Sequence, residues 1–170
     1  MPRGTPPSAL EKAMRILSLR ACSVAELTAK LHRAGYPPDE TRAAVDECRK
    51  RHYLDDELLA EDCSAMWRAR GHGNRSIRFK LRQRGVPEEL VENALGATGG
   101  EESDAAVAAI ESRLYALLRE KDPRKRRAKA LRFLAARGFS GDAVSAGMRR
   151  LRAAERDAEA ENGEDFTAEV

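Results

Sequence analysis

The segment Leu81-Arg82-Gln83-Arg84-Gly85-Val86 has two counterparts in the chain. They are Leu31-His32-Arg33-Ala34-Gly35-Tyr36 and Leu134-Ala135-Ala136-Arg137-Gly138-Phe139, and their glycines lie 50 and 53 residues apart. Each copy has a leucine, three intervening residues, a glycine and a large apolar residue, and a helix-start signal follows. Self-similarity at this period is typical of repeat proteins. The chain is therefore expected to be an extended binding protein rather than one built around a single catalytic pocket.

The residues after each glycine extend the similarity. Nine positions beyond the apolar partner come Val45, Leu95 and Met148, each preceded by the small residue Ala44, Ala94 or Gly147. We predict an all-α fold of three tandem three-helix repeats in an elongated array, followed by a disordered acidic C-terminal tail. The expected ranges are 8–54, 55–98 and 101–153 for the repeats and 154–170 for the tail. Units this small share stability through their neighbours.

The composition favours helices over strands. Charged residues make up 35% of the chain and aromatic residues 5%, and no alternating run is long enough for a strand. Capping signals then indicate where the helices begin and end. Ser23 and Glu26 have the spacing of a capping box. The third repeat is expected to begin with one helix that reaches about Arg119, and its last helix is expected to end near Arg152.

The net charge of +3 hides an asymmetry. Residues 153–170 contain seven acids and one base, which gives −6, so residues 1–152 carry +9. A basic body indicates an anionic partner, and the acidic tail is expected to compete for the same surface.

Several classes of protein do not fit the sequence. The three cysteines and three histidines form no metal-ligand pattern, so neither a metal nor another cofactor is expected. The polar start lacks a signal peptide, and no apolar stretch could span a membrane, which favours a cytoplasmic protein. Nucleophile–base pairs are not apparent. Asp55 and Asp56 are expected to cap a helix rather than catalyse, and Gly71-His72-Gly73 is expected to break one.

A first basic run lies between Asp62 and Glu88, where no acid occurs. Ile77 and Leu81 share one helical face, and Arg75, Arg78 and Arg82 form a stripe well away from it. Such a row could neutralise phosphates or meet an acidic protein groove, or it could be a solvated face with distant acidic partners. Phe79, beside the stripe, is expected to pack between repeats rather than contact a partner. The candidate binding residues here are Arg68, Arg70, Arg75, Arg78, Lys80, Arg82 and Arg84.

A second basic run occupies the equivalent position in the third repeat, with no acid from Pro123 to Gly141. Cations at a helix N-terminus are slightly unfavourable, which favours a binding role for them. The candidates are Arg124, Lys125, Arg126, Arg127, Lys129 and Arg132.

Tyr53-Leu54-Asp55-Asp56, followed by Gly73 and by Ile77-Arg78-x-x-Leu81-Arg82-x-x-Gly85-Val86, resembles the signature of the RecX family. The similarity covers most of residues 9–152 and is strongest over 53–95. Two departures are Leu58-Leu59, where an Arg-Phe pair is common, and Lys80, where an acid is common.

The resemblance implies three three-helix units without a catalytic site. It also implies binding in the groove of the RecA–DNA filament and inhibition of RecA's ATPase and strand exchange in DNA repair, homologous recombination and the SOS response. The charge is compatible with direct contact to single-stranded DNA. No membrane partner is expected, and a monomer is favoured because no heptad seam is visible. The alternative is an independent helical DNA-binding regulator.

Overall fold

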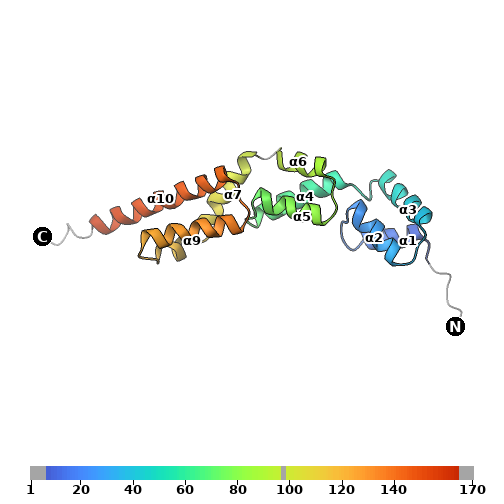
Figure 1. Cartoon of the computed structure of the whole chain (residues 1–170), viewed down its shortest axis with the longest axis horizontal. Coiled ribbons are helices and arrows are strands. Elements are labelled where there is room, and N and C mark those ends of the chain that lie inside the picture. Colours follow the sequence, from blue (N-terminus) through green and yellow to red (C-terminus); the bar gives the residue numbers. More distant parts are fainter. Residues whose placement is uncertain (1–6, 97–98, 165–170) are drawn as a thin grey trace, which may run out of the picture. The chain divides into compact units, whose positions relative to one another are not determined.

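The computed structural model describes residues 7–96 and 99–164, and within these ranges the chain forms helices and no strand. The all-α prediction is confirmed (Figure 1). The first two repeats contain α1 (Ala9–Leu17), α2 (Val24–Arg33), α3 (Pro38–Lys50), α4 (Asp56–Ala69), α5 (Asn74–Gln83) and α6 (Glu88–Gly96). The third repeat contains α7 (Gly99–Glu111), α8 (Leu114–Leu118), α9 (Pro123–Ala136) and α10 (Gly141–Glu164).

The repeated Leu-x-x-x-Gly-apolar segment ends the middle helix of every repeat in the same way. Gly35, Gly85 and Gly138 adopt left-handed φ angles of +91°, +73° and +77°. The amide that follows each glycine donates to the carbonyl of the leucine, a Schellman ending. These bonds are Tyr36–Leu31 (3.2 Å), Val86–Leu81 (3.2 Å) and Phe139–Leu134 (3.3 Å). The three leucines are fully buried, so the repeat marks both a helix end and a core position.

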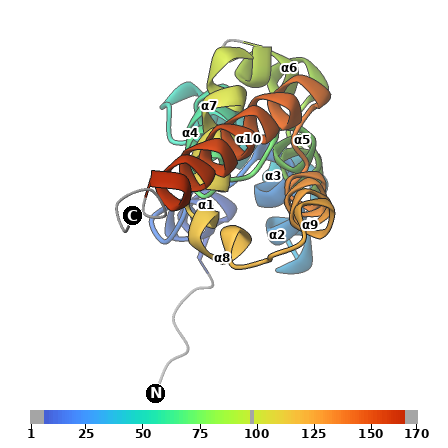
Figure 2. The ribbon, with the colours of Figure 1, turned by 90° about the vertical axis from the view of Figure 1, so that its left-hand side faces the viewer.

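The chain separates into two compact units that divide the second repeat between them. The first unit comprises residues 1–64 and 78–94, and the second comprises residues 65–77 and 95–170. The first unit has a core of apolar residues from α1, α2 and α3, including Leu27, Leu31 and Cys48. In the second, α10 packs against α7 and α9 around Ile110, Leu134 and Leu151 (Figure 2). Cys22, Cys48 and Cys63 are free and buried.

Within the first unit, the start of α2 is joined to the second repeat by polar contacts. An Asp56 carboxylate oxygen accepts the Val24 amide at 2.9 Å. The Arg84 guanidinium donates to the Glu26 carboxylate at 2.8 Å and to the Ala21 carbonyl at 2.9 Å. The first amides of a helix have no carbonyl partner within that helix. Here a carboxylate from the next repeat accepts one of them.

The second unit repeats this joint between α5 and the third repeat. A Glu102 carboxylate oxygen accepts the Asn74 amide at 2.7 Å, as Asp56 accepts that of Val24. Arg137 Nη1 donates to the Arg70 carbonyl at 2.9 Å. Both arginines that reach back immediately precede a turn glycine, so the Arg-Gly pair forms part of the joint between repeats.

The expected single helix from Glu101 to Arg119 is instead two, α7 and α8. Ser112 Oγ donates to the Ala109 carbonyl at 2.8 Å, and such side-chain bonds compete with the helical backbone. Arg113, at φ −117° and ψ 3°, leaves the helical conformation. Its guanidinium carbon lies 4.6 Å from the centroid of the Phe133 ring, so contact with α9 favours the break.

The last helix also differs from the expectation, because α10 continues past Arg152 to Glu164. Ala154 and Glu155 are buried. Glu155 accepts from Arg126 Nη1 at 3.0 Å and from Arg127 Nη2 at 2.8 Å. Packing of this turn against α9 thus extends the helix into the segment expected to be disordered, and residues 165–170 lie outside the described residues.

Candidate partner-binding surface

Three of the thirteen candidate cations lie inside the fold. The side chains of Arg68, Arg84 and Arg126 are 7%, 17% and 12% exposed. Each donates to a carboxylate of another helix, namely Glu101, Glu26 and Glu155. Such burial and pairing give these arginines a role in holding helices together.

Two candidates on α5 reach the surface but are neutralised by α6. Arg78 Nε lies 2.5 Å from Glu92 Oε1, and its Nη2 lies 2.9 Å from Oε2. Arg82 Nε lies 2.6 Å from Glu88 Oε2 in a second two-point contact. The hydrogen bond from Arg78 lowers the pKa of Glu92. The acidic partners of Arg78 and Arg82 therefore lie on the next helix.

Two candidates on α9 are exposed and likewise paired. Arg127 donates to Glu155, and Lys129 donates to Glu120. The hydrogen bond from Lys129 lowers the pKa of Glu120. On α5, Lys80 is half-buried.

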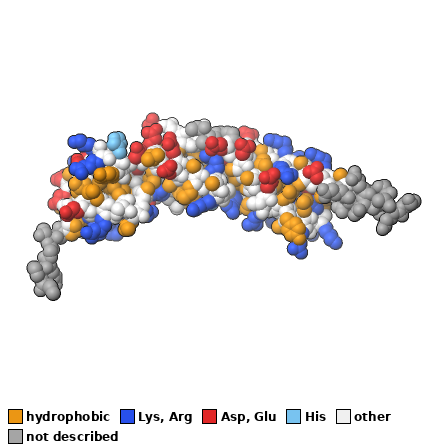
Figure 3. Space-filling view, turned by 180° about the vertical axis from the view of Figure 1, so that it is seen from behind, with side chains coloured by type: hydrophobic (Ala, Val, Ile, Leu, Met, Phe, Trp, Pro, Cys, Tyr) orange, Lys and Arg blue, Asp and Glu red, His pale blue; other side chains and the backbone are white. Residues whose placement is uncertain are grey.

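The remaining candidates are exposed and make no salt bridge within 4 Å to any side chain that the structure describes. We call them the open cations: Arg70, Arg75, Arg124, Lys125 and Arg132. Lys and Arg side chains are exposed over both units, and acidic side chains lie among them (Figure 3). Only cations without an internal partner can neutralise an incoming anion without first losing an ion pair.

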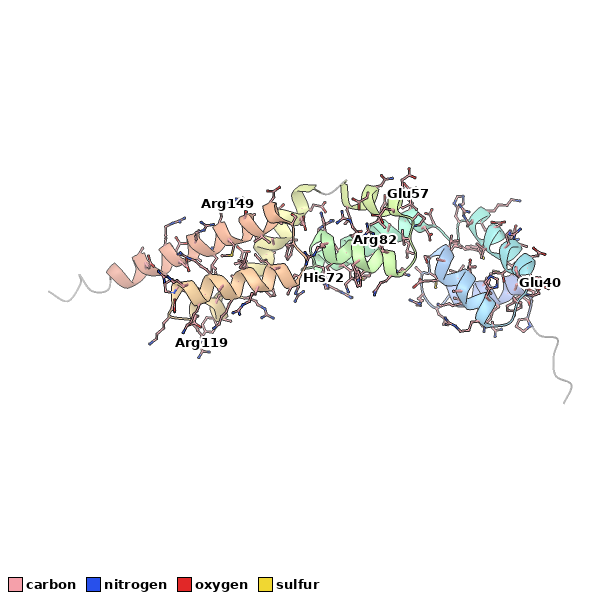
Figure 4. All side chains as sticks on the ribbon, viewed as in Figure 1. Glu40, Glu57, His72, Arg82, Arg119 and Arg149 are labelled. Atoms are coloured by element: carbon pink, nitrogen blue, oxygen red, sulfur yellow. The ribbon has the colours of Figure 1, made fainter. Side chains whose placement is uncertain are left out.

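Several large apolar side chains are exposed on the helices that carry the basic runs or close to them in sequence. Phe79 is 61% exposed, so the prediction that it packs between repeats is wrong. It lies on α5 three residues before Arg82, which Figure 4 labels. In the third repeat Tyr115 and Leu131 are 79% and 49% exposed. Isolated exposed apolar residues are ordinary on protein surfaces, so these side chains do not by themselves mark a binding site.

The signature aspartates both accept backbone amides. Asp55 Oδ1 accepts from Glu57 and Leu58 at 3.0 and 3.1 Å, which confirms the predicted cap of α4. Asp56 instead caps α2, a contact that the sequence does not predict because its partner lies 32 residues away. Burial raises the pKa of Asp56.

Protein-family models match the chain in three consecutive segments. Models of the first, second and third three-helix domains of RecX match residues 9–48, 55–95 and 101–147. The chain belongs to the RecX family. The regulatory protein RecX of Chlorobaculum tepidum is 31% identical over 145 residues, covering 85% of this chain and 88% of that protein. Its counterpart in Thermus thermophilus is 38% identical over 131 residues, covering 77% and 83%.

Solved RecX structures have the same fold. The crystal structure of RecX from Lactobacillus salivarius superposes with a TM-score of 0.77 at 20% identity, covering 85% of this chain and 94% of that one. A second RecX structure gives a TM-score of 0.70 at 22% identity, covering 83% and 70%. The chain is therefore a member of a family of regulatory proteins. In the part of the chain that the structure describes, no helix has the length and apolar character of a membrane span.

Proposed function

We propose that this chain binds the filament that a RecA recombinase forms on DNA and inhibits its activity in DNA repair. Membership of the RecX family carries the proposal, because that family's curated members are regulatory proteins. The protein acts without catalysis, as a cytoplasmic monomer.

The open cations form the proposed contact surface. A nucleoprotein filament offers phosphates and acidic side chains, and these attract cations that have no internal partner. Arg70 and Arg75 lie in the second repeat, and Arg124, Lys125 and Arg132 lie in the third. The ion-paired Arg78 and Arg82 contribute less, because Glu88 and Glu92 already neutralise them.

Inhibition follows if the bound protein occupies the groove along which strand exchange proceeds or the end at which subunits add. Several contacts spread over consecutive repeats fit an extended partner better than a small ligand. Single-stranded DNA within the filament is an additional contact for the open cations.

A co-sedimentation assay tests this function. The chain is mixed with RecA alone, with single-stranded DNA alone, and with filaments assembled from RecA, single-stranded DNA and a slowly hydrolysed ATP analogue. We expect sedimentation with the filament to exceed that with either component. Equal binding to DNA alone would favour the independent DNA-binding regulator, and no binding to the filament would exclude the proposal.

A further inference from the structure

A hollow of about 530 Å³ opens in the second unit between the end of α4 and the helices α7 and α9. Three arginines line it, Arg68, Arg70 and Arg137, and Asp104 is the one acid among the described residues of its wall. Its size is within the range of small-ligand sites, about 300–1,000 Å³. Arg68 is already paired with Glu101, whereas Arg70 and Arg137 make no salt bridge to a described side chain. Two cations are therefore available around a space that could enclose one small anionic group.

Arg68 supplies a donor that the fold leaves without a partner. Its side chain is 7% exposed. Nη1 donates to Glu101 at 3.1 Å and Nη2 donates to Asn74 at 2.9 Å, while the buried Nε has no acceptor among the described residues. Buried donors without acceptors are rare in folded proteins, and a ligand is one explanation for them.

Phe133 gives the hollow a planar surface. The guanidinium carbon of Arg137, which also lines the hollow, lies 5.4 Å from the ring centroid. Nucleobases stack both on aromatic rings and on arginine guanidinium planes. An arrangement of ring and guanidinium groups therefore fits a flat aromatic group better than a compact anion.

The wall formed by α7 consists of small side chains. Ala105, Ala108 and Ala109 line the hollow, so a flat ring can approach this helix closely. Asp104, beside them, can accept hydrogen bonds from the amino groups that guanine, adenine and cytosine carry and thymine lacks.

We propose that this hollow is a nucleotide-binding site, with the base against Phe133 and the alanine wall and the phosphate beside Arg70 and the unpartnered Nε of Arg68. A free mononucleotide and an unpaired nucleotide of a single strand share this chemistry. The site goes beyond filament regulation, because it would bind a nucleotide even in the absence of a recombinase.

Calorimetric titration of the full chain tests the site with dGMP, dTMP and inorganic phosphate. We expect dGMP to bind at least about tenfold more tightly than phosphate, since stacking adds to the phosphate contact. dTMP should bind more weakly than dGMP, and Asp104→Asn should reduce that difference. If dGMP binds no more tightly than phosphate and a single strand binds independently of the hollow, the proposal is wrong.

Two variants with matched controls locate the binding. Ala108→Leu fills the hollow, whereas Ala128→Leu adds the same side chain to the exposed face of α9. Arg70→Ala removes a lining cation, whereas Arg149→Ala removes an exposed one from α10 (Figure 4). We expect the first member of each pair to weaken nucleotide binding about tenfold or more and the second to leave it unchanged.

A twelve-residue single strand, intact or with abasic sites, distinguishes the two sources of nucleotide. If Ala108→Leu weakens binding of the intact strand but not that of the abasic strand, the hollow takes a nucleotide of the strand. If only mononucleotide binding weakens, it takes the free form. Equal affinities of the parent and Ala108→Leu for every nucleotide and strand would overturn the proposal. Filament binding is measured separately by co-sedimentation, so failure of this site does not depend on failure of the proposed function.

Discussion

The Arg84 guanidinium reaches back to the Glu26 carboxylate, with Nη2 2.8 Å from Oε2 and Nε 3.3 Å from Oε1. The side chains are 17% and 20% exposed, and the two residues belong to different repeats. The same guanidinium donates to Cys63 Sγ at 3.0 Å. Arg84 was a candidate for partner binding in the sequence, and its contacts show that it joins the first two repeats.

Replacing Arg84 should therefore lower the free energy of unfolding more than replacing Arg82, which lies on the exposed stripe. Arg84→Ala leaves the partly buried Glu26 carboxylate with Arg20, 3.6 Å away and 57% exposed, as its remaining cation among the described residues. We expect the free energy of unfolding to fall by about 2 kcal/mol. Arg82→Ala, the control, should melt close to the parent, because exposed pairs contribute little. Urea unfolding followed by circular dichroism measures both. Equal stability of the two variants would contradict the role of Arg84 in the joint.

Acid should weaken the same joint. Burial alone would raise the pKa of Glu26, but hydrogen bonds from Arg84 and the Ser23 amide outweigh it and lower this pKa. The unfolded chain, whose glutamate pKa is about 4.3, therefore takes up a proton before the folded chain does. Stability should fall as the pH drops from about 5 through the folded pKa.

Glu26→Gln provides the test of this pH dependence. The variant should be less stable than the parent at pH 7, and its stability should fall less between pH 5 and pH 3. Glu40→Gln, which removes an exposed carboxylate of α3 (Figure 4), serves as the control and should follow the parent curve. Parallel curves for Glu26→Gln and the parent would show that this carboxylate is not linked to folding.

The close approach at Gly73 predicts a large effect from one added methyl group. A Cβ at this position would lie 2.3 Å from the backbone nitrogen of Phe139, whereas one at Gly141 would meet nothing within 4 Å. Gly73→Ala should therefore lower the free energy of unfolding by about 3 kcal/mol or more, since backbone cannot move aside cheaply. Gly141→Ala should be nearly neutral. Thermal melts that do not separate the two variants would argue against this packing.

The sequence predicted those features that depend on neighbouring residues. The turn at Gly85 and the capping box at Ser23 are local, because each is determined by residues within one or two helical turns. Burial of Ile77 and Leu81 was also predictable, since both share one face of a helix at about 100° per residue.

Features that depend on distant partners were missed. The absence of acids between Asp62 and Glu88 favoured a binding surface over a solvated face with distant acidic partners, but Glu92 meets Arg78 from the next helix. Likewise, the break between α7 and α8 contains neither glycine nor proline and involves contact between Arg113 and Phe133. A stretch of sequence without acids does not show whether its cations are paired, because residues far apart along the chain can be in contact in the fold.

The acidic tail should be separable from the part of α10 that supports the fold. Deleting residues 161–170 removes four acids and should tighten binding to single-stranded DNA at low salt. Deleting residues 154–170 also removes Glu155 and leaves the mostly buried Arg126 without its carboxylate partner, so this variant should melt at a lower temperature. Unchanged DNA affinity after the shorter deletion would remove the case for autoinhibition, and unchanged melting after the longer one would remove the role of Glu155.

Co-sedimentation of open-cation variants with the RecA filament tests the central claim most directly. One variant replaces all five open cations by alanine; its control replaces the ion-paired surface residues Arg78, Arg82, Arg127 and Lys129. We predict that the first variant folds, loses most filament binding and inhibition, and lowers the salt slope of binding by roughly three to five. The control should retain more binding. If the folded five-residue variant bound and inhibited like the parent, the open cations would not be the recognition surface.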